Sequence, residues 1–239
     1  MIRINKYIAS GGTYSRRSAE ELIKNKKVTL NGKVVTDLAT LVDENNDTVA
    51  INGKNISPIN KKIYIMLHKP KGYITTLSDD KGRHTVMEFF PDYLKKVIKP
   101  IGRLDRDSEG LLLFTNDGEL NKTLTHPSSH VKKYYQVTIE GQITKEELMR
   151  LNKGVEIDVA GEKELTHPIR VKVLSENKDK NTTKLEVIIA EGKNREIRKM
   201  FESINKVIIL LKRTQIGKLT LGGLPRGKYK DFIPSLTMK

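Results

Sequence analysis

The chain has 239 residues, of which 37% are apolar and 31% are charged, a balance typical of a soluble globular protein. This length suits one large domain, or one small domain followed by a domain of medium size. Apolar runs such as residues 207–211 stop far short of the roughly 18 residues that a membrane span needs. The chain has no cysteine, which excludes disulfide bonds and thiolate metal sites. We therefore expect a cytoplasmic protein with no membrane partner.

The charge balance is strongly basic. Forty-four Lys and Arg residues stand against 29 Asp and Glu residues, which gives a formal net charge of +15 at pH 7 and a pI of about 9.7. A field of this sign attracts polyanions and is screened by salt. The composition therefore favours a nucleic-acid partner, and a charge that serves only solubility is the alternative.

The first 58 residues have the pattern of a small module that opens with two helices. Ile4, Tyr7 and Ile8 recur at helical spacing, and a pair of glycines then ends the pattern. Ser15 is expected to be the N-cap of a second helix, which begins in "RRSAEELIKN". Alternating strand residues flank Asn31-Gly32 and again Asn52-Gly53, so two β-hairpins should follow the helices.

Basic residues crowd the two helices of this module and the turn after them. They are Arg3, Lys6, Arg16, Arg17, Lys24, Lys26 and Lys27. They form either a solvated helix face or a phosphate-binding face. The ordered stretch "RINKYIAS…SRRSAEELIKNKKVTLNGKVV" resembles the alpha-L RNA-binding motif, which implies the second interpretation. One departure is Lys26, where that family usually has glycine, and a lysine costs energy there if the turn requires a positive φ.

A larger α+β domain is expected at residues 63–239, after a polar linker at 59–62. The segments "YYQVTIEG" and "KLEVIIAEG" predict strands. A helix should begin after Thr144, with Glu147 in the capping-box position. A later amphipathic helix presents apolar residues at positions i, i+3, i+4 and i+7, namely Ile197, Met200, Phe201 and Ile204.

Few cofactor signatures fit this larger domain. The five histidines do not form a metal-binding cluster. A G-x-x-x-x-G-K pattern begins at Gly222, but Tyr229 stands where Ser or Thr would hold magnesium, so we expect a loop there. No flavin or nicotinamide fingerprint is present. We therefore expect neither a metal nor a cofactor.

Asp105, in "PIGRLDRDSEGLLLF", admits three interpretations from its residue type alone. It could cap a turn, act as a nucleophile, or share a magnesium ion with Asp107 and Asp117 in a nuclease. Arg103 and Arg106 already supply positive charge beside it, which weighs against the magnesium site.

Its neighbours resemble the signature of pseudouridine synthases, in the subfamily that joins an alpha-L RNA-binding motif to the catalytic domain and modifies ribosomal RNA. The similarity runs along most of the chain, through "KPKGYITT", "GRLD", "KKYYQV", "EGKNREIRKMF" and "LLKRTQIGKLTLGGLPRGKY". It implies a catalytic domain built on a mixed or antiparallel sheet. One departure is Glu196, where glutamine is usual.

The resemblance implies conversion of uridine to its C-glycoside isomer, a reaction that needs no redox carrier or energy source. Asp105 would be the nucleophile, Arg198 its ionic partner, and Tyr135 would lie against the uracil and take part in proton transfer. The target base must leave the stacked helix. Arg103 would fill the vacated space or hold a phosphate.

Contacts to the RNA backbone are expected from further basic residues of the larger domain, in addition to those of the N-terminal module. They are Lys69, Lys71, Lys193, Arg195 and Lys199. The similarity of "SRRSAEELI" and "GGLPRGKY" favours large-subunit ribosomal RNA as substrate. The alternatives are small-subunit ribosomal RNA or a non-catalytic RNA-binding protein of ribosome assembly. A monomer is the default expectation.

Overall fold

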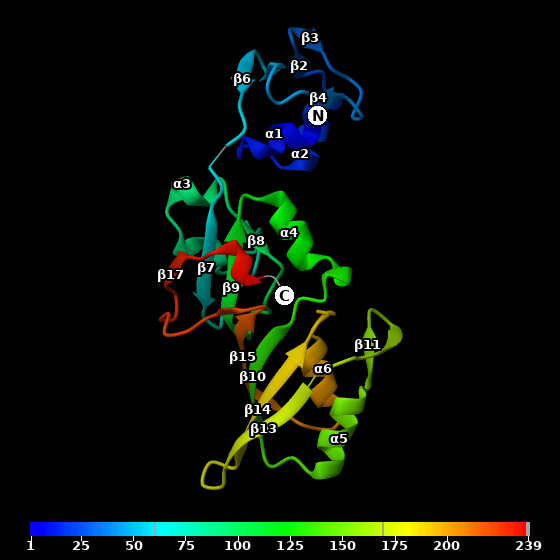
Figure 1. Cartoon of the computed structure of the whole chain (residues 1–239), viewed down its shortest axis with the longest axis vertical. Helices are drawn as coiled ribbons and strands as arrows, with labels where there is room; N and C mark the ends of the chain where they lie inside the picture. The colour runs from blue at the N-terminus through cyan, green and yellow to red at the C-terminus, as the bar shows by residue number, and fades with distance from the viewer. Residues whose placement is uncertain (60, 169, 238–239) are drawn as a thin grey trace. The chain divides into compact units, whose positions relative to one another are not determined.

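A computed structural model describes residues 1–59, 61–168 and 170–237 of the chain (Figure 1). Two compact units divide it: Met1–Ile63 with Phe90–Lys99, and Tyr64–Phe89 with Pro100–Lys239. The expected linker at 59–62 includes residue 60, which lies outside the described residues. None of the described helices combines the length and apolar character needed to cross a bilayer.

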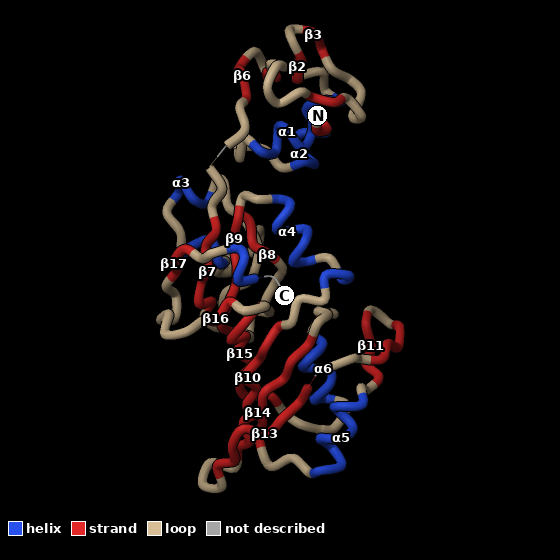
Figure 2. Tube along the Cα trace, viewed as in Figure 1, coloured by secondary structure: helices blue, strands red, loops and turns tan. Residues whose placement is uncertain are grey.

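The first unit contains short helices and small antiparallel sheets, which Figure 2 distinguishes by colour. Its helices are α1 (Ile4–Ser10), α2 (Arg16–Lys24) and α3 (Asp92–Lys95). Its strands are β1 (Ile2–Arg3), β2 (Val28–Leu30), β3 (Lys33–Val34), β4 (Leu41–Val42), β5 (Val49–Ile51) and β6 (Lys54–Ile56). They pair in the order β3-β2-β5-β6, with β1 and β4 forming a separate pair.

The local predictions for this unit are confirmed. The Ser15 side chain caps α2 by accepting from the backbone N–H of Ser18, whose own hydroxyl accepts from the Ser15 N–H, so the two residues form a capping box. Asn31 and Gly32 both have positive φ, at 50° and 80°, as a two-residue hairpin turn requires. The apolar positions of α1 and α2 meet in one buried core with residues of the small strands.

Lys26 adopts the left-handed conformation, with a φ of 56°. The lysine therefore occupies the backbone geometry that its usual glycine counterpart would favour. Because a Cβ disfavours this region, the turn costs on the order of 1 kcal/mol more with lysine than with glycine.

The division between the units differs from the expected domains at residues 90–99, which group with the N-terminal unit rather than with the larger one. Gly12, with φ 81°, lies close to this segment, since a Cβ added to it would be 3.0 Å from Val97 Cγ1. Two segments far apart in sequence therefore share this packing, which a pattern along the chain does not reveal.

The second unit contains a nine-stranded mixed sheet together with helices, which agrees with the predicted α+β class. The main order is β13-β14-β10-β15-β9-β7-β17, with β16 paired to β15 and β8 paired to β9. Along the main order and between β15 and β16 the pairs are antiparallel, except that β15 and β9 are parallel. The strands of the second unit are β7 (Tyr64–Lys69), β8 (Lys99–Ile101), β9 (Glu109–Thr115), β10 (Lys133–Glu140), β11 (Glu156–Val159), β12 (Glu162–Leu165), β13 (Arg170–Asn177), β14 (Thr182–Ile189), β15 (Ile208–Ile216), β16 (Leu219–Thr220) and β17 (Tyr229–Asp231). Of these, β11 and β12 form a separate two-stranded sheet.

Three α-helices accompany this sheet: α4 (Gly118–Thr125), α5 (Lys145–Lys153) and α6 (Glu196–Glu202). Helices α5 and α6 lie beside the part of the sheet that contains β13, β14 and β10 (Figure 1). The predicted capping box of Thr144 and Glu147 is present at α5. In α6 the predicted apolar stripe is buried, although Ile204 lies beyond the last helical residue.

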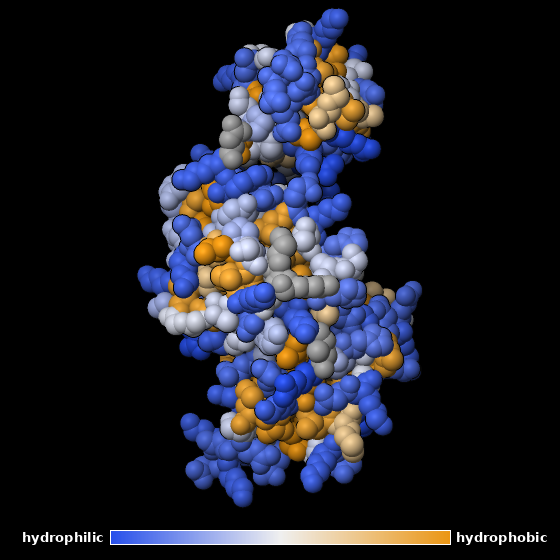
Figure 3. Space-filling view, viewed as in Figure 1, coloured by the Kyte–Doolittle hydropathy of each residue, from blue (hydrophilic) through white to orange (hydrophobic). Residues whose placement is uncertain are grey.

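Every residue of β9 is buried, and this strand lies inside the sheet between β15 and β7. Hydrophilic side chains cover most of the visible face of each unit (Figure 3). The G-x-x-x-x-G-K segment forms the loop between β16 and β17, as the sequence predicts.

Candidate active site

Asp105 lies in the loop that connects β8 to the central strand β9, and this loop is held by the end of β7. The Lys69 ammonium donates to the backbone carbonyls of Asp105 at 3.0 Å and Ser108 at 2.8 Å. Thr75 Oγ1 donates to the Leu104 carbonyl at 2.8 Å. These contacts fix the backbone on both sides of the Asp105 side chain.

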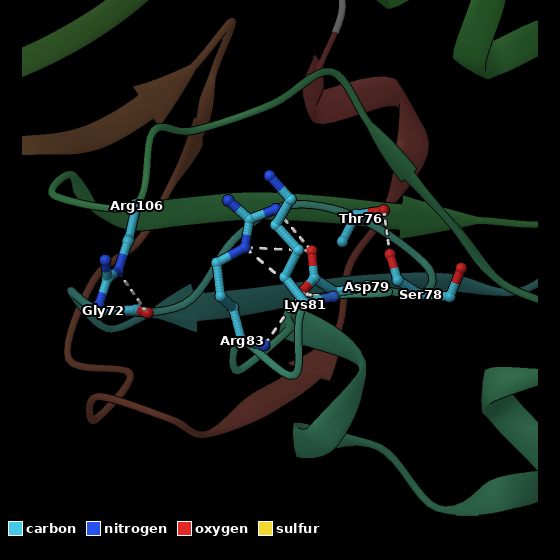
Figure 4. A network of polar contacts seen from close by, with 7 residues as sticks. All are labelled: Gly72, Thr76, Ser78, Asp79, Lys81, Arg83 and Arg106. Atoms are coloured by element: carbon cyan, nitrogen blue, oxygen red, sulfur yellow. Dashed lines mark hydrogen bonds and ion pairs between the residues drawn. The ribbon is translucent and has the colours of Figure 1, made fainter.

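A second connection joins this loop to the segment after β7. The Gly72 N–H donates to the Arg106 carbonyl at 2.8 Å, and Arg106 Nε donates back to the Gly72 carbonyl at 3.3 Å (Figure 4). The same figure shows the Arg83 guanidinium directed at Asp79, with the shortest N–O distance 2.6 Å. Hydrogen bonds from Arg83 hold the pKa of Asp79 at about 2, so this local ion pair persists at neutral pH.

Lys69 corrects a sequence prediction, because it was expected to contact the RNA backbone. Its side chain is fully buried, and its ammonium also bonds to the Pro70 carbonyl at 3.0 Å. Burial lowers its pKa to about 8, although Asp105 and Asp107 act in the opposite direction. Lys69 therefore supports the Asp105 loop from inside and presents no charge to an external phosphate.

Two guanidinium groups face the Asp105 carboxylate. Arg198 Nε lies 3.6 Å from Asp105 Oδ2, and Arg195 Nη1 lies 3.9 Å from the same oxygen. Arg198 Nη2 also donates to the Asp107 carbonyl and to Ser108 Oγ, at 3.1 and 3.2 Å. Arg198 is therefore anchored to the loop that carries Asp105, whereas Arg195 is more exposed.

Asp105 and Tyr135 line one pocket of about 440 Å³ in the larger unit. Tyr135 lies opposite Arg213 in the pairing of β10 with β15, next to a register irregularity between Tyr134 and Tyr135. Such a bulge re-aims side chains next to it. Tyr135 is buried, with 8% of its surface exposed, while Tyr134 is half-buried. This difference is consistent with side chains on opposite faces of the strand.

Arg213 is a site residue that the sequence analysis missed. It lines the pocket with only 4% exposure, its Nε donates to the Leu111 carbonyl at 2.7 Å, and its Nη2 has no hydrogen-bond partner among the described residues. Strand β15 enters the site because β9 contains Gly110, where a Cβ would lie 2.2 Å from the Arg213 carbonyl oxygen. The β15 sequence, IILLKRTQI, has no apolar–polar alternation that would mark Arg213 as buried, so only the sheet pairing reveals it.

A cluster of ionisable groups forms another wall of the pocket. Lys133 donates to the Ala190 carbonyl at 3.2 Å, and burial lowers its pKa. Glu196 is 3% exposed, and burial raises its pKa to about 8, with the charge of Glu191 as the next cause. Lys133 and Glu191 were not singled out from the sequence, because only the fold brings them to Glu196.

The remaining basic residues of the larger unit that were expected to contact RNA differ in their exposure and in their present hydrogen-bond partners. Arg103 is exposed and lines the pocket. Lys71 donates to the Ile209 carbonyl at 2.7 Å, and Lys199 donates to the Asp158 carbonyl. Lys193 bridges Glu164 at 3.0 Å and Glu191 at 3.5 Å. Burial acts to lower the pKa of Lys193, but these two carboxylates outweigh it and raise the pKa.

The basic residues singled out in the N-terminal unit are all exposed, on β1, on α1, on α2 and in the turn that follows α2. They are Arg3, Lys6, Arg16, Arg17, Lys24, Lys26 and Lys27. This placement leaves their charges at the surface, where phosphate groups can approach.

The geometry does not favour the magnesium interpretation of Asp105. Asp117 is the N-cap of α4, where it accepts the N–H groups of Glu119 and Leu120 at 3.1 and 3.4 Å. It also accepts the Tyr64 hydroxyl at 3.0 Å. Across residues 1–59, 61–168 and 170–237, no three His, Asp or Glu side chains are grouped to hold a metal ion.

Comparisons with known proteins identify the class of enzyme to which this fold and pocket belong. The RNA pseudouridylate synthase family matches residues 63–203, and the S4 domain matches residues 2–49. The chain therefore belongs to the RNA pseudouridylate synthase family, and it is an RNA pseudouridine synthase.

Individual relatives cover almost the whole chain. A ribosomal large subunit pseudouridine synthase B of Bacillus subtilis is 42% identical over 234 residues, which is 98% of this chain and 93% of that protein. An uncharacterized RNA pseudouridine synthase of Aquifex aeolicus is 36% identical over 232 residues, covering 97% and 90%. A crystal structure of a pseudouridylate synthase superposes with a TM-score of 0.69 at 28% identity, covering 98% of this chain and 97% of that one.

Proposed function

We propose that this enzyme isomerises a uridine of large-subunit ribosomal RNA to pseudouridine, with Asp105 as the nucleophile. The observation that carries the assignment is the position of Asp105, which lines the pocket beside Tyr135 while two guanidinium groups face its carboxylate. The target class rests on similarity to the Bacillus subtilis protein, whose name specifies the large subunit.

The chemistry suits these groups. Arg198 and Arg195 face the Asp105 carboxylate and orient its oxygen, and a carboxylate can attack an electrophilic carbon of the nucleoside. The N-glycosidic bond breaks, the uracil turns within the pocket, and its C5 bonds to C1′ of the same ribose. The proton on C5 leaves and a proton is gained on N1, so no atom is added overall. Tyr135 is placed on the pocket wall, where its ring can lie against the uracil.

Substrate capture divides between the two units in this proposal. The uridine is flipped from its stack into the pocket, at a cost of a few kcal/mol. Arg103, exposed at the pocket, either fills the vacated space or holds a flanking phosphate. The N-terminal unit, which we propose acts as the RNA-binding domain, supplies surface cations for the RNA backbone. Further contacts near the pocket form once phosphate groups replace the present partners of four basic residues. These are Lys71, Lys193, Arg195 and Lys199.

We also propose, as the sequence led us to expect, that the enzyme acts in the cytoplasm as a monomer. Small-subunit ribosomal RNA is the competing substrate. Membership in the pseudouridylate synthase family argues against the non-catalytic assembly protein that the sequence left open.

The test is site-specific. Ribosomal RNA from cells with and without the gene is labelled with carbodiimide, and reverse-transcription stops are mapped. We expect one large-subunit stop to vanish in the deletion and to return with the wild-type gene but not with Asp105→Asn.

Asp107→Asn is the matched control, because it removes an exposed carboxylate from the same loop and should restore the stop. A stop restored by Asp105→Asn would contradict the nucleophile assignment. A lost stop in the small-subunit RNA would instead correct the substrate.

A further inference from the structure

Glu196 has an unsatisfied oxygen in the wall of the pocket. Its Oε2 accepts the backbone N–H of Lys193 at 3.1 Å. Its Oε1 is buried, and no N–H or O–H group of the described residues donates to it. A buried carboxylate oxygen without a donor costs free energy, so an ionised Glu196 is poorly accommodated here.

The neighbouring acidic group is Glu191, which lines the same pocket and whose charge acts on the Glu196 carboxyl. Glu191 already has donors of its own: Oε1 accepts the His167 N–H at 3.1 Å, and Oε2 lies 3.5 Å from the Lys193 ammonium. Two adjacent carboxyl groups in such a site share one proton rather than ionise together. The partners of Glu191 favour its charge, so the proton belongs on Glu196.

We propose that Glu196 is a positioning residue that works as a neutral carboxylic acid, with its proton donated to Glu191 and its other oxygen bound to the Lys193 amide. This pair holds the segment 191–195, which directs Arg195 towards Asp105. The proposal rests on the assignment of Asp105 as the reacting group.

The protonation state agrees with this geometry. Burial, followed by the charge of Glu191, raises the pKa of Glu196 to about 8. Burial also acts to raise the pKa of Glu191, but hydrogen bonds from His167 and Glu196 and the charge of Lys193 lower it overall. Glu196 is therefore protonated and Glu191 ionised at neutral pH.

Charged groups surround this pair from every element that forms the wall. Lys193 and Arg195 lie on the same segment, Lys133 lies on β10, and Arg213 lies on β15. These cations favour ionisation of Glu196, as the contribution of Lys193 to its pKa illustrates. Arg198 and Lys199 follow on α6 and Asp105 faces Arg195, but burial and Glu191 outweigh the cations.

Ionisation would place two carboxylates in contact. Their repulsion would separate Glu191 from Glu196 and loosen the segment that ends at Arg195. Because Arg195 adopts a left-handed backbone conformation with a φ of 52°, its side-chain direction depends on that segment being held. Glutamine has nearly the same shape as protonated Glu196, can donate to Glu191, and cannot lose a proton in this range.

The first test compares single-turnover rates of wild type, Glu196→Gln and Glu196→Ala on the RNA target between pH 6 and 9.5. If the ionised form is inactive, the wild-type rate should fall about tenfold between pH 7 and pH 9 for a pKa near 8. Glu196→Gln should lack this loss, whereas Glu196→Ala should be slow at every pH. Superimposable profiles of wild type and Glu196→Gln would overturn the proposal.

Thermal unfolding gives a second readout that does not require Asp105 to be the nucleophile. Because the folded-state pKa of Glu196 is raised, its stabilising contribution is full below its unfolded pKa of about 4.3 and is lost as pH rises through about 8. The melting temperature of Glu196→Gln minus that of wild type should therefore increase from pH 5 to pH 8.5 and then level.

The same comparison in the Asp105→Asn background separates the two proposals. The pH-dependent melting difference should persist there, whether or not Asp105→Asn abolishes turnover. In a Glu191→Gln background the difference should level off at a lower pH and reach a smaller value, since the neighbouring charge that raises the folded-state pKa of Glu196 is gone. A melting difference that does not change with pH would overturn the inference even if Asp105 proves to be the nucleophile.

Discussion

The basic residues of the two units are used in opposite ways. In the N-terminal unit, those singled out from the sequence are all exposed, and none belongs to its buried core. In the larger unit, Lys69 is fully buried and Arg213 is 4% exposed, and both donate to backbone carbonyls. A net charge of +15 therefore includes cations that can meet RNA and cations that hold the active-site loop in place.

Replacing the buried lysine should give the largest effect. Lys69→Met keeps an apolar stem but removes the ammonium that donates to the carbonyls of Pro70 and Ser108, whereas the Asp105 carbonyl still accepts the Ser108 N–H. Because each unsatisfied buried carbonyl costs about 1–3 kcal/mol, we expect a loss of about 3 kcal/mol in the free energy of unfolding and little activity. Urea unfolding monitored by circular dichroism measures this loss.

The matched control is Lys71→Met, which removes an exposed lysine two residues later. It should change the free energy of unfolding by no more than about 0.5 kcal/mol. If both variants lost the same free energy of unfolding, the burial of Lys69 would not determine its contribution to stability.

The next contrast separates turnover from capture. Arg198→Ala removes a guanidinium that faces Asp105, and we expect kcat to fall by about 10²–10³-fold with a smaller change in RNA affinity. Arg16→Ala removes an exposed cation of α2 and should mainly weaken RNA binding. Single-turnover rates and filter binding on the same RNA measure both quantities.

Salt dependence sharpens this contrast. If Arg16 neutralises one phosphate, Arg16→Ala should reduce the slope of log affinity against log salt concentration by about 0.7–0.9. Arg198→Ala should leave that slope nearly as it was. The reverse pattern would show that the catalytic and binding roles have been exchanged.

The smallest expected effect is a gain in stability in the N-terminal unit. Lys26→Gly should raise the free energy of unfolding by about 0.5–1 kcal/mol, because Lys26 has a φ of 56° and glycine accepts this conformation without steric cost. Lys27→Gly removes the same charge at the next exposed position, where no positive φ favours glycine, and should not stabilise the protein. Calorimetry of both variants distinguishes relief of backbone strain from removal of like charge.

Local sequence patterns correctly predicted several secondary-structure features within both units. The cap at Ser15, the capping box at Thr144 and the hairpin at Asn31-Gly32 all involve residues within three positions of one another. The stability of these caps and turns depends on side chains and dihedral angles that neighbouring residues in the sequence specify. The same is true of the apolar stripe of α6, although the pattern extended past the end of the helix to Ile204.

The family and its enzymatic class were also accessible from the sequence, because the motifs occur in order along nearly the whole chain. Several site features were not. The grouping of residues 90–99 with the N-terminal unit and the burial of Lys69 depend on contacts between distant segments.

The sequence by itself determined the helices, the hairpins, the basic character and the motifs that mark the enzyme family, since each of these is written in short-range order or composition. The tertiary structure alone decided which charges are buried. Sheet pairing places Arg213 opposite Tyr135, and the segment before α6 brings Glu191 to Glu196. Burial and proximity of charges depend on the three-dimensional arrangement, and they decide which cation supports the fold and which carboxyl keeps its proton.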